Sequence, residues 1–532
     1  MTAKVSVAGS TAVAVASVID QLVADRVASR IAAKDFTLWG KEAEDESSKR
    51  LGWVTSATDS ADLVEPILAL KAEFAAKGVT RFVLCGMGGS SLAPEVITRT
   101  AGVELVVLDS TEPSQVQAAL HGDLAKTAVV VSSKSGSTVE TDSQKRIFEQ
   151  AFTAAGIYKT DRIVIVTDPG SPMEAAAKAD GYRIFNADPT VGGRYSALTA
   201  FGLVPSGLAG ADIAQLLSDA AAAGQVFSQD TATNPALILG AAMARTASLY
   251  GFRDKLGVLC DGTSIVGFGD WAEQLIAEST GKIDKGVLPV VLESQSVEVS
   301  SQPTDLVLAR VVADASEAKD GEISVSGSLG EQFLLWEYAT VIASRLIGIN
   351  PFDQPDVESA KIAARGMLEQ RAEISAPRFV SEGVEVRTTS LNIADAETLG
   401  QAIRGLFAEL AADGFVSVQT YLDRTAVPQA ADLRDQIAAA TGRPTTFGWA
   451  PRFLHSTGQY HKGGPKQGVY LQINCHPEAD LAVPGREFTF GELIASQAAG
   501  DAAVLGNLGR PVLTLTLTDV AAGLAAIKNA IG

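Results

Sequence analysis

One loop of this sequence is rich in hydroxyl side chains and lies between two regular elements. The apolar run from Lys126 to Ser133 predicts a buried parallel strand, and the spacing from Thr138 to Phe152 predicts a helix. A loop that leaves the carboxyl end of a strand and opens a helix presents unpaired backbone N–H groups and the positive end of the helix dipole. This serine loop, Ser133–Thr141, is therefore predicted to bind a phosphate group. Its candidate ligands are Ser133, Lys134, Ser135, Ser137, Thr138 and Thr141.

The alternative for the serine loop is an ordinary helix start, because serine and threonine favour N-terminal caps for structural reasons. Five hydroxyl groups around one glycine exceed what capping requires, so phosphate binding is the favoured interpretation. Lys134 adds a positive charge. Glu140 is expected to point away from the bound phosphate.

A glycine-rich turn follows the strand predicted at Arg81–Cys85. Gly88 and Gly89 let a ligand approach the backbone there, and Ser90 offers a hydrogen-bond donor. The turn is not a dinucleotide fingerprint, because Ser91 occupies the place of the third glycine in G-x-G-x-x-G. We expect this turn and the serine loop to meet in one crevice at the carboxyl ends of their strands.

Two further segments contain a charged residue next to the predicted start or end of a helix. Gly193 and Arg194 can present a backbone N–H and a guanidinium to one anion, although a solvated arginine at a helix start is the alternative. The helix predicted over Trp271–Thr280 places Gln274 and Glu278 one turn apart on one face. A carboxylate near the helix C-terminus has a raised pKa, which suits a general base, whereas most such glutamates are merely solvated.

Alternating strand and helix patterns supply the elements that would position these residues. Five apolar runs between 81 and 185 predict a doubly wound parallel sheet, and a second such series opens at Lys255. The tail has a βαββαβ pattern over 414–517. The apolar run Val5–Ile19 continues at helical spacing to Ile31, which favours one amphipathic packing helix over a signal peptide. The predicted domains are 1–206, with this helix and the first sheet, 207–376, with the second, and the C-terminal α/β extension 377–532.

The composition restricts the class of protein. The 532 residues are 46% hydrophobic, which allows a large core, and the net charge of −19 disfavours nucleic acid or an anionic membrane as partner. No uninterrupted apolar segment is long enough to span a bilayer. The 3 cysteines lie far apart without a C-x-x-C pair, so neither a disulfide framework nor a zinc site is predicted, and a reducing cytoplasm fits.

Five motifs then occur in a fixed order. They are G-x-G-G-S at 86–90, Ser133-Lys134 with Thr138 and Thr141, V-G-G-R ending at Arg194, Q-x-x-x-E-S-x-G-K at 274–282, and N-x-F-D-Q-x-x-V-E-x-x-K at 350–361. In these motifs the sequence resembles the phosphoglucose (glucose-6-phosphate) isomerases. The resemblance implies an α/β fold with two doubly wound parallel-sheet sugar-isomerase (SIS) domains, and it implies roles for the matching residues. Ser90, Ser133, Thr138 and Thr141 would hold the sugar phosphate with Lys134 close by; Glu278 would be the base; Gly193 and Arg194 would face the enediol; Gln354 and Lys361 would contact the sugar.

The sequence departs from the family pattern at one point. The family's ring-opening histidine lies between the glutamate and the glutamine motif, but no histidine occurs between His121 and His455 here. The stretch 450–464 is predicted to be a polar loop, and His455 is favoured for this role over His461 and over a purely structural loop histidine. If His455 only supports the structure, Lys361 or water would open the ring. This tail is similar to the end of the isomerase half of transaldolase and phosphoglucose isomerase fusion proteins.

The resemblance implies reversible aldose–ketose isomerisation of glucose 6-phosphate and fructose 6-phosphate through a cis-enediol. That chemistry needs no metal and no cofactor, and its partner is a small sugar phosphate. The family commonly builds its sites near a dimer interface, so a homodimer is compatible with the sequence. The alternatives are another sugar-phosphate isomerase, which need not keep Glu278 or Arg194, and a sugar-phosphate-binding regulator, which would usually carry a basic DNA-binding segment that is not seen here.

Overall fold

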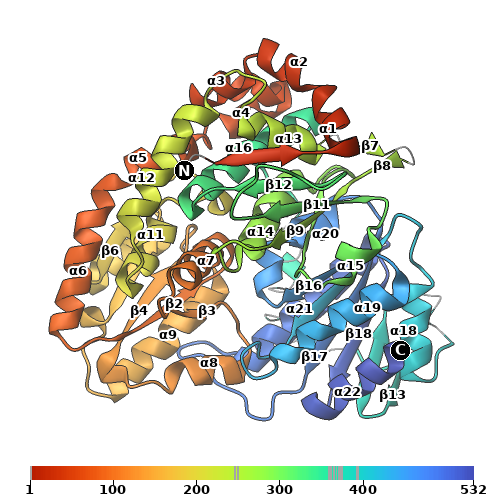
Figure 1. The fold of residues 1–532 in the computed structure, drawn as a ribbon. Coiled ribbons are helices and arrows are strands. Elements are labelled where there is room, and N and C mark those ends of the chain that lie inside the picture. The colour runs from red at the N-terminus through yellow and green to blue at the C-terminus, as the bar shows by residue number, and fades with distance from the viewer. Residues whose placement is uncertain are drawn as a thin grey trace.

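The computed structural model describes residues 3–244, 247, 248, 251–356, 362, 363, 366, 368, 375–390, 393 and 395–532. Three sheets carry the architecture, each flanked by helices (Figure 1). The first lies at the lower left of that view, the second at the top, and the C-terminal one at the lower right.

The first sheet is fully parallel, with the order β3-β2-β4-β5-β6. Its strands are β2 (Arg81–Gly86), β3 (Val106–Leu108), β4 (Thr127–Ser132), β5 (Ile163–Thr167) and β6 (Arg183–Asn186). The helices are α6 (Val64–Ala76), α7 (Leu92–Ala101), α8 (Pro113–Leu120), α9 (Val139–Ala154), α10 (Pro172–Asp180) and α11 (Ala200–Ala209). The chain moves from β2 to β3 in one direction and then to β4 in the other, so a switch point lies between β2 and β4. Gly86 pairs with Ser132 at the ends of those strands, so the glycine turn and the serine loop are neighbours, as predicted.

The second sheet repeats this winding in the order β1-β12-β11-β9-β10. Its parallel strands are β9 (Lys255–Cys260), β10 (Leu288–Val291), β11 (Leu306–Val311) and β12 (Ile323–Ser326). The helices are α12 (Ile213–Phe227), α13 (Pro235–Ala244), α14 (Phe268–Thr280), α15 (Val297–Ser301) and α16 (Leu329–Ile347). Both predicted doubly wound sheets are therefore present. A two-stranded ribbon of β7 (Ala247–Ser248) and β8 (Gly251–Phe252) precedes the second.

The single N-terminal helix predicted over 5–31 is wrong. The segment forms β1 (Lys4–Val7), α1 (Gly9–Ala16), α2 (Ile19–Ala24) and α3 (Val27–Ala32). β1 pairs antiparallel with β12, and Gly9 then takes a positive φ of 55° that separates strand from helix. Pairing with a strand more than 300 residues away thus overrides the local helical spacing. Further short helices are α4 (Glu44–Ser47) and α5 (Ser56–Asp59).

The C-terminal sheet has the order β13-β14-β18-β17-β15-β16. The strands are β13 (Phe379–Ser381), β14 (Val384–Thr388), β15 (Phe415–Tyr421), β16 (Thr445–Trp449), β17 (Gly468–Cys475) and β18 (Val512–Leu517), and the helices are α18 (Leu399–Phe407), α19 (Leu433–Thr441), α20 (Gly458–Gly463), α21 (Phe490–Asn507) and α22 (Val520–Ile531). The predicted βαββαβ pattern is present, and the hairpin β13–β14 adds an antiparallel edge. Phe415, Tyr460 and Tyr470 share a buried cluster with Leu259 and Ala277, so this unit packs directly on the second sheet.

Within the described ranges, no helix is long and apolar enough to cross a membrane.

Candidate active site

The serine loop holds its hydroxyl groups together at the start of α9. Ser133 Oγ lies 3.0 Å from Thr138 Oγ1, and the backbone N–H of Gly136 donates to Ser133 Oγ over 3.2 Å. Thr138 is the N-cap residue of α9, yet its side chain makes no capping hydrogen bond. Thr141 is fully buried, and its Oγ1 has no hydrogen-bond partner. Capping does not use these hydroxyls, which favours the phosphate interpretation over the ordinary helix start.

The three other predicted ligands lie toward the outside of the loop. Lys134 Nζ donates to Asp168 Oδ2 over 2.5 Å, and burial lowers the pKa of Lys134. Ser135 and Ser137 are exposed and bond to one another, with 3.1 Å between their hydroxyl oxygens. Their part in phosphate binding stays a prediction.

Three turns meet so closely that only glycine fits at the contacts. Gly88, in the 3₁₀ turn η5 (Gly88–Ser90), has a φ of 56°, and a Cβ there would lie 2.7 Å from the carbonyl oxygen of His455. A Cβ on Gly89 would lie 2.0 Å from the carbonyl oxygen of Gly193, in η8 (Gly193–Tyr195). Real Cβ atoms do not approach backbone this closely, so the glycines bring the three segments around one crevice.

Glu278 lies in the last turn of α14 at this crevice and is 5% exposed. Arg194 Nη1 is 3.5 Å from Glu278 Oε2, and Gln274 Nε2 is also 3.5 Å from that oxygen. Gln274 Nε2 donates to the carbonyl of His455 over 2.8 Å. The buried Oε1 of Gln274 has no partner, so a polar acceptor remains beside the carboxylate. A buried carboxylate between an arginine and an amide is suited to moving a proton.

The Arg194 guanidinium binds the loop that carries the predicted sugar-contact residues. It donates to Gln354 Oε1 over 3.2 Å and to the carbonyl of Pro351 over 2.5 Å. Lys282 Nζ reaches the same loop and donates to Asp353 Oδ1 over 2.7 Å. Burial lowers the pKa of Lys282 to about 8, assisted by Arg194 and opposed by Asp353.

Lys361 lies outside the described residues.

The imidazole of His455 enters this crevice from the C-terminal unit. His455 ends the 3₁₀ turn η11 (Arg452–His455), and its Nε2 lies 2.9 Å from Glu140 Oε1. Glu140 was expected to point away from the bound phosphate, and its carboxylate contacts His455 and Gln497 in the C-terminal unit. Glu140 is buried in the first turn of α9, and the same oxygen accepts a hydrogen bond from Gln497 Nε2 over 2.7 Å. The sequence gives no local sign of this contact, because both partners lie more than 300 residues along the chain.

Arg452 anchors the turn that carries His455. Its Nε donates to Asp109 Oδ2 over 2.5 Å, and its Nη2 donates to Glu95. Burial raises the pKa of Glu95, but the guanidinium groups of Arg452 and Arg424 outweigh it and lower that pKa to about 2. The turn is thus held to the first sheet by charged, hydrogen-bonded pairs.

Comparison with known proteins finds a match to one protein family. Residues 62–305 match the family model of phosphoglucose isomerase. Over this region the chain is similar to the phosphoglucose isomerases. It is 28% identical over 351 residues to a probable glucose-6-phosphate isomerase of Haloarcula marismortui, covering 54% of this chain and 78% of that protein. It is 28% identical over 450 residues to a glucose-6-phosphate isomerase of a Synechococcus species, covering 76% of this chain and 80% of that protein.

Solved structures show the same fold. A hypothetical protein from Thermus thermophilus superposes with a TM-score of 0.56 at 25% identity, covering 67% of this chain and 96% of the other. A glucose-6-phosphate isomerase from Chlamydia trachomatis superposes with a TM-score of 0.52 at 20% identity, covering 63% of this chain and 75% of the other. The family match ends at residue 305, so the unit that supplies His455 lies beyond it.

His461, the other histidine of the 450–464 stretch, has a different setting. The stretch is not a polar loop, because it forms η11 and α20 and is largely buried. The His461 ring contacts the rings of Phe453 and Tyr470, and its nitrogens lie 3.4 Å from Ser417 Oγ and 3.2 Å from Gln419 Nε2. Burial lowers the pKa of His461 well below its usual value. Of the two, only His455 is placed at the crevice by these contacts.

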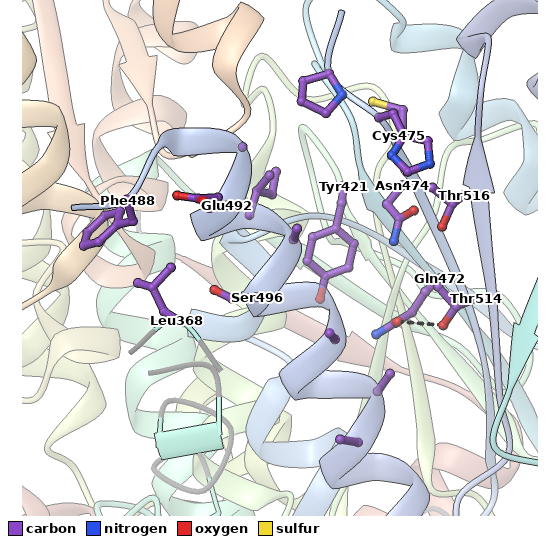
Figure 2. A pocket seen from close by; sticks show the side chains of 18 of the residues that line it. Leu368, Tyr421, Gln472, Asn474, Cys475, Phe488, Glu492, Ser496, Thr514 and Thr516 are labelled. Carbon is purple, nitrogen blue, oxygen red and sulfur yellow. Dashed lines mark hydrogen bonds between the residues drawn. The ribbon is translucent and has the colours of Figure 1, made fainter. Parts of the chain in front are cut away.

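A large cavity lies beside this site rather than in it. It has a volume of about 1270 Å³ and borders the outer edge of the serine loop at Gly136 and Ser137. Figure 2 shows its wall along α21 and the ends of the C-terminal strands. Neither Glu278 nor Arg194 lines it, so we locate the catalytic centre from the contacts and not from cavity size.

Among the described residues, no group of three histidine, cysteine or acidic side chains could hold a metal ion. The 3 cysteines are all free thiols.

Proposed function

We propose that this chain interconverts glucose 6-phosphate and fructose 6-phosphate through a cis-enediol. The proposal rests on one observation: three groups of side chains line the same crevice. They are the serine loop, the buried carboxylate of Glu278 beside Arg194, and the His455–Glu140 pair. The relatives named glucose-6-phosphate isomerase support the choice of substrate.

In this proposal the serine loop binds the phosphate. Ser133 and Thr138 hold their hydroxyls 3.0 Å apart at the start of α9, and Thr141 has a buried hydroxyl without a partner. Ser90 lies on the adjoining turn. Because the phosphate does not react, these contacts bind substrate and transition state alike. Their task is to fix the position of the first two sugar carbons relative to Glu278.

Glu278 then moves a proton between C1 and C2. It takes the proton from one carbon as a carboxylate and returns it to the neighbouring carbon as a carboxylic acid, so the base is regenerated. The enediol carries negative charge on its oxygens while this happens. The Arg194 guanidinium lies 3.5 Å from Glu278 and would stabilise that charge, together with the backbone N–H of the neighbouring Gly193. Gln354, held by Arg194, would contact the sugar hydroxyls.

Ring opening needs a second proton carrier, and His455 is our assignment. The contact with Glu140 fixes Nε2 as the protonated nitrogen of the neutral ring, which leaves Nδ1 for the substrate. Glu140 also stabilises the imidazolium, which donates its proton to the ring oxygen. Lys361 stays a second candidate from the sequence.

The remaining parts of the proposal concern context. The described chemistry uses a carboxylate and an imidazole, so we propose that no metal or organic cofactor takes part. We also propose a cytoplasmic protein that acts on a small sugar phosphate, with no nucleic acid or membrane partner, and a homodimer as its assembly.

The test is turnover of fructose 6-phosphate in EDTA, read through glucose-6-phosphate dehydrogenase. We expect activity in the wild-type chain and a loss of about 10²–10⁴-fold in Glu278→Gln. Binding of fructose 6-phosphate without turnover would instead favour the regulator. Turnover of a different sugar phosphate alone would favour another isomerase.

A further inference from the structure

Gln497 stands next to the proposed ring-opening pair and has no role in the mechanism above. It lies on α21 of the C-terminal unit and is 4% exposed. Its Nε2 donates over 2.7 Å to Glu140 Oε1, the oxygen that also lies 2.9 Å from His455 Nε2. One carboxylate oxygen therefore serves both side chains. Resting on the proposed function, we propose that Gln497 is a positioning residue that sets how strongly the Glu140–His455 pair holds its proton.

The orientation of the Gln497 amide is fixed from its other end. Thr111 follows β3 in the first sheet and is fully buried, and its hydroxyl donates to Gln497 Oε1 over 2.9 Å. An amide whose oxygen accepts from Thr111 must turn its NH₂ group toward Glu140. The series of hydrogen bonds that links Thr111, Gln497, Glu140 and His455 thus has one consistent set of donors and acceptors.

This series of hydrogen bonds joins two units of the fold. Thr111 and Glu140 belong to the first sheet unit, whereas Gln497 and His455 belong to the C-terminal unit. The C-terminal unit therefore supplies both the imidazole and the amide that restrains the partner of that imidazole. A hydrogen bond from a neutral amide stabilises the carboxylate form of Glu140. It also fixes the carboxylate plane, which sets the direction of the bond to His455.

Other charged groups on the adjoining elements have partners of their own. They are Arg452 on η11, bound to Asp109 and Glu95; Glu278 on α14, beside Arg194; and Lys462 on α20, bound to Asp501. Gln497 is a neutral donor to the pair.

The consequence of removing the donor has a defined sign. Without the Gln497 N–H, the Glu140 carboxylate is less stabilised as an anion, so the pair binds its shared proton more tightly. The pair then titrates at a higher pH. Loss of one hydrogen bond to a charged group corresponds to a shift of about one pH unit. Each protonated imidazole should then open the ring more slowly, by less than about tenfold, because the proton is given up less readily.

The experiment compares Gln497→Met with Ser496→Ala. Methionine keeps the length of glutamine but cannot donate, whereas Ser496 neighbours Gln497 on α21 and bonds only to the carbonyl of Leu493. The pH titration of the His455 imidazole is followed by NMR. The chain has 4 histidines, and loss of a resonance in His455→Ala identifies the relevant one.

We expect the His455 titration to move up by about one pH unit in Gln497→Met and not in Ser496→Ala. The limb of the pH–turnover profile on which activity is lost as His455 gives up its proton should move up with it. Thr111→Val should produce a smaller shift of the same sign, and it serves if Gln497→Met does not fold. An unchanged His455 titration in folded Gln497→Met or Thr111→Val overturns the inference. The NMR readout does not depend on turnover, so an inactive wild-type chain would refute the proposed function separately.

Discussion

The pairing of Glu140 with His455 yields a prediction that separates ring opening from proton transfer. Glu140→Gln keeps the size of the side chain and removes its charge. The bond it weakens is buried and 2.9 Å long, and a hydrogen bond to a charged group contributes about 1.5–3 kcal/mol. Ring opening should therefore slow about ten- to a hundredfold. His455→Ala removes the proton carrier, and general acid–base catalysis typically contributes about 10²–10⁴-fold.

The assay needs one substrate that closes into a ring and one that cannot. Fructose 6-phosphate is cyclic, and its turnover is read through glucose-6-phosphate dehydrogenase. In 5-deoxyfructose 6-phosphate the C5 hydroxyl is missing and the C6 oxygen is phosphorylated, so this ketose stays open. Exchange of its C1 protons with deuterated solvent reports the Glu278 step alone. Both variants should be slow on the first substrate and close to wild type in the exchange.

The double variant tests whether Glu140 acts through His455. If it does, Glu140→Gln should add nothing to His455→Ala, because the two side chains form one unit. His476→Ala is the matched control, since His476 also bonds a glutamate, over 3.1 Å, but lies exposed in the C-terminal unit. Equal losses on cyclic and open substrates would refute the reasoning, and Glu140 and His455 would then only support the shape of the site.

Three further predictions concern Glu278, the serine loop and Lys282. Glu278→Gln should lower turnover and solvent exchange by about 10²–10⁴-fold with an unchanged melting temperature, and normal exchange would remove Glu278 from its role. The double variant Ser133→Ala, Thr138→Ala should raise the Michaelis constant and leave turnover nearly intact. If it binds 6-phosphogluconate as tightly as wild type, the serine loop is only the start of a helix and not a phosphate site. Lys282 has a pKa of about 8, so its charge and its bond to Asp353 are present below that pH and lost above it. Activity should fall above pH 8, and Lys282→Met should be impaired at pH 7 without that alkaline limb.

Local pattern was enough to predict the parts of the site that lie at strand ends. The glycine turn and the serine loop each follow an apolar strand, and parallel strands place their carboxyl ends at one edge. The same reasoning predicted both doubly wound sheets. Gln274 and Glu278 were predicted on one face because helical spacing alone decides that relation.

Contacts between distant segments lay beyond local reasoning. The partners of Glu140 were not predicted because the serine loop was considered without the units that cover it. Its partners His455 and Gln497 come from the C-terminal unit. β1 was expected to be helical because its partner β12 is equally remote. In each case a tertiary partner decides the outcome, and one sequence does not reveal which segments meet.

The position of His455 nevertheless follows from a topological rule. The C-terminal sheet places β15 between β16 and β17, so the chain must cross β15 on its way from one to the other. α19 packs against α22, while α20, in the crossing segment, packs against α21. The direction of winding therefore reverses between β15 and β17, as it does between β2 and β4. Residues that leave a strand at such a reversal lie at the ligand-binding edge of the sheet. η11 leaves the carboxyl end of β16, the edge strand next to β15, so His455 lies at the same end of the sheet as this reversal.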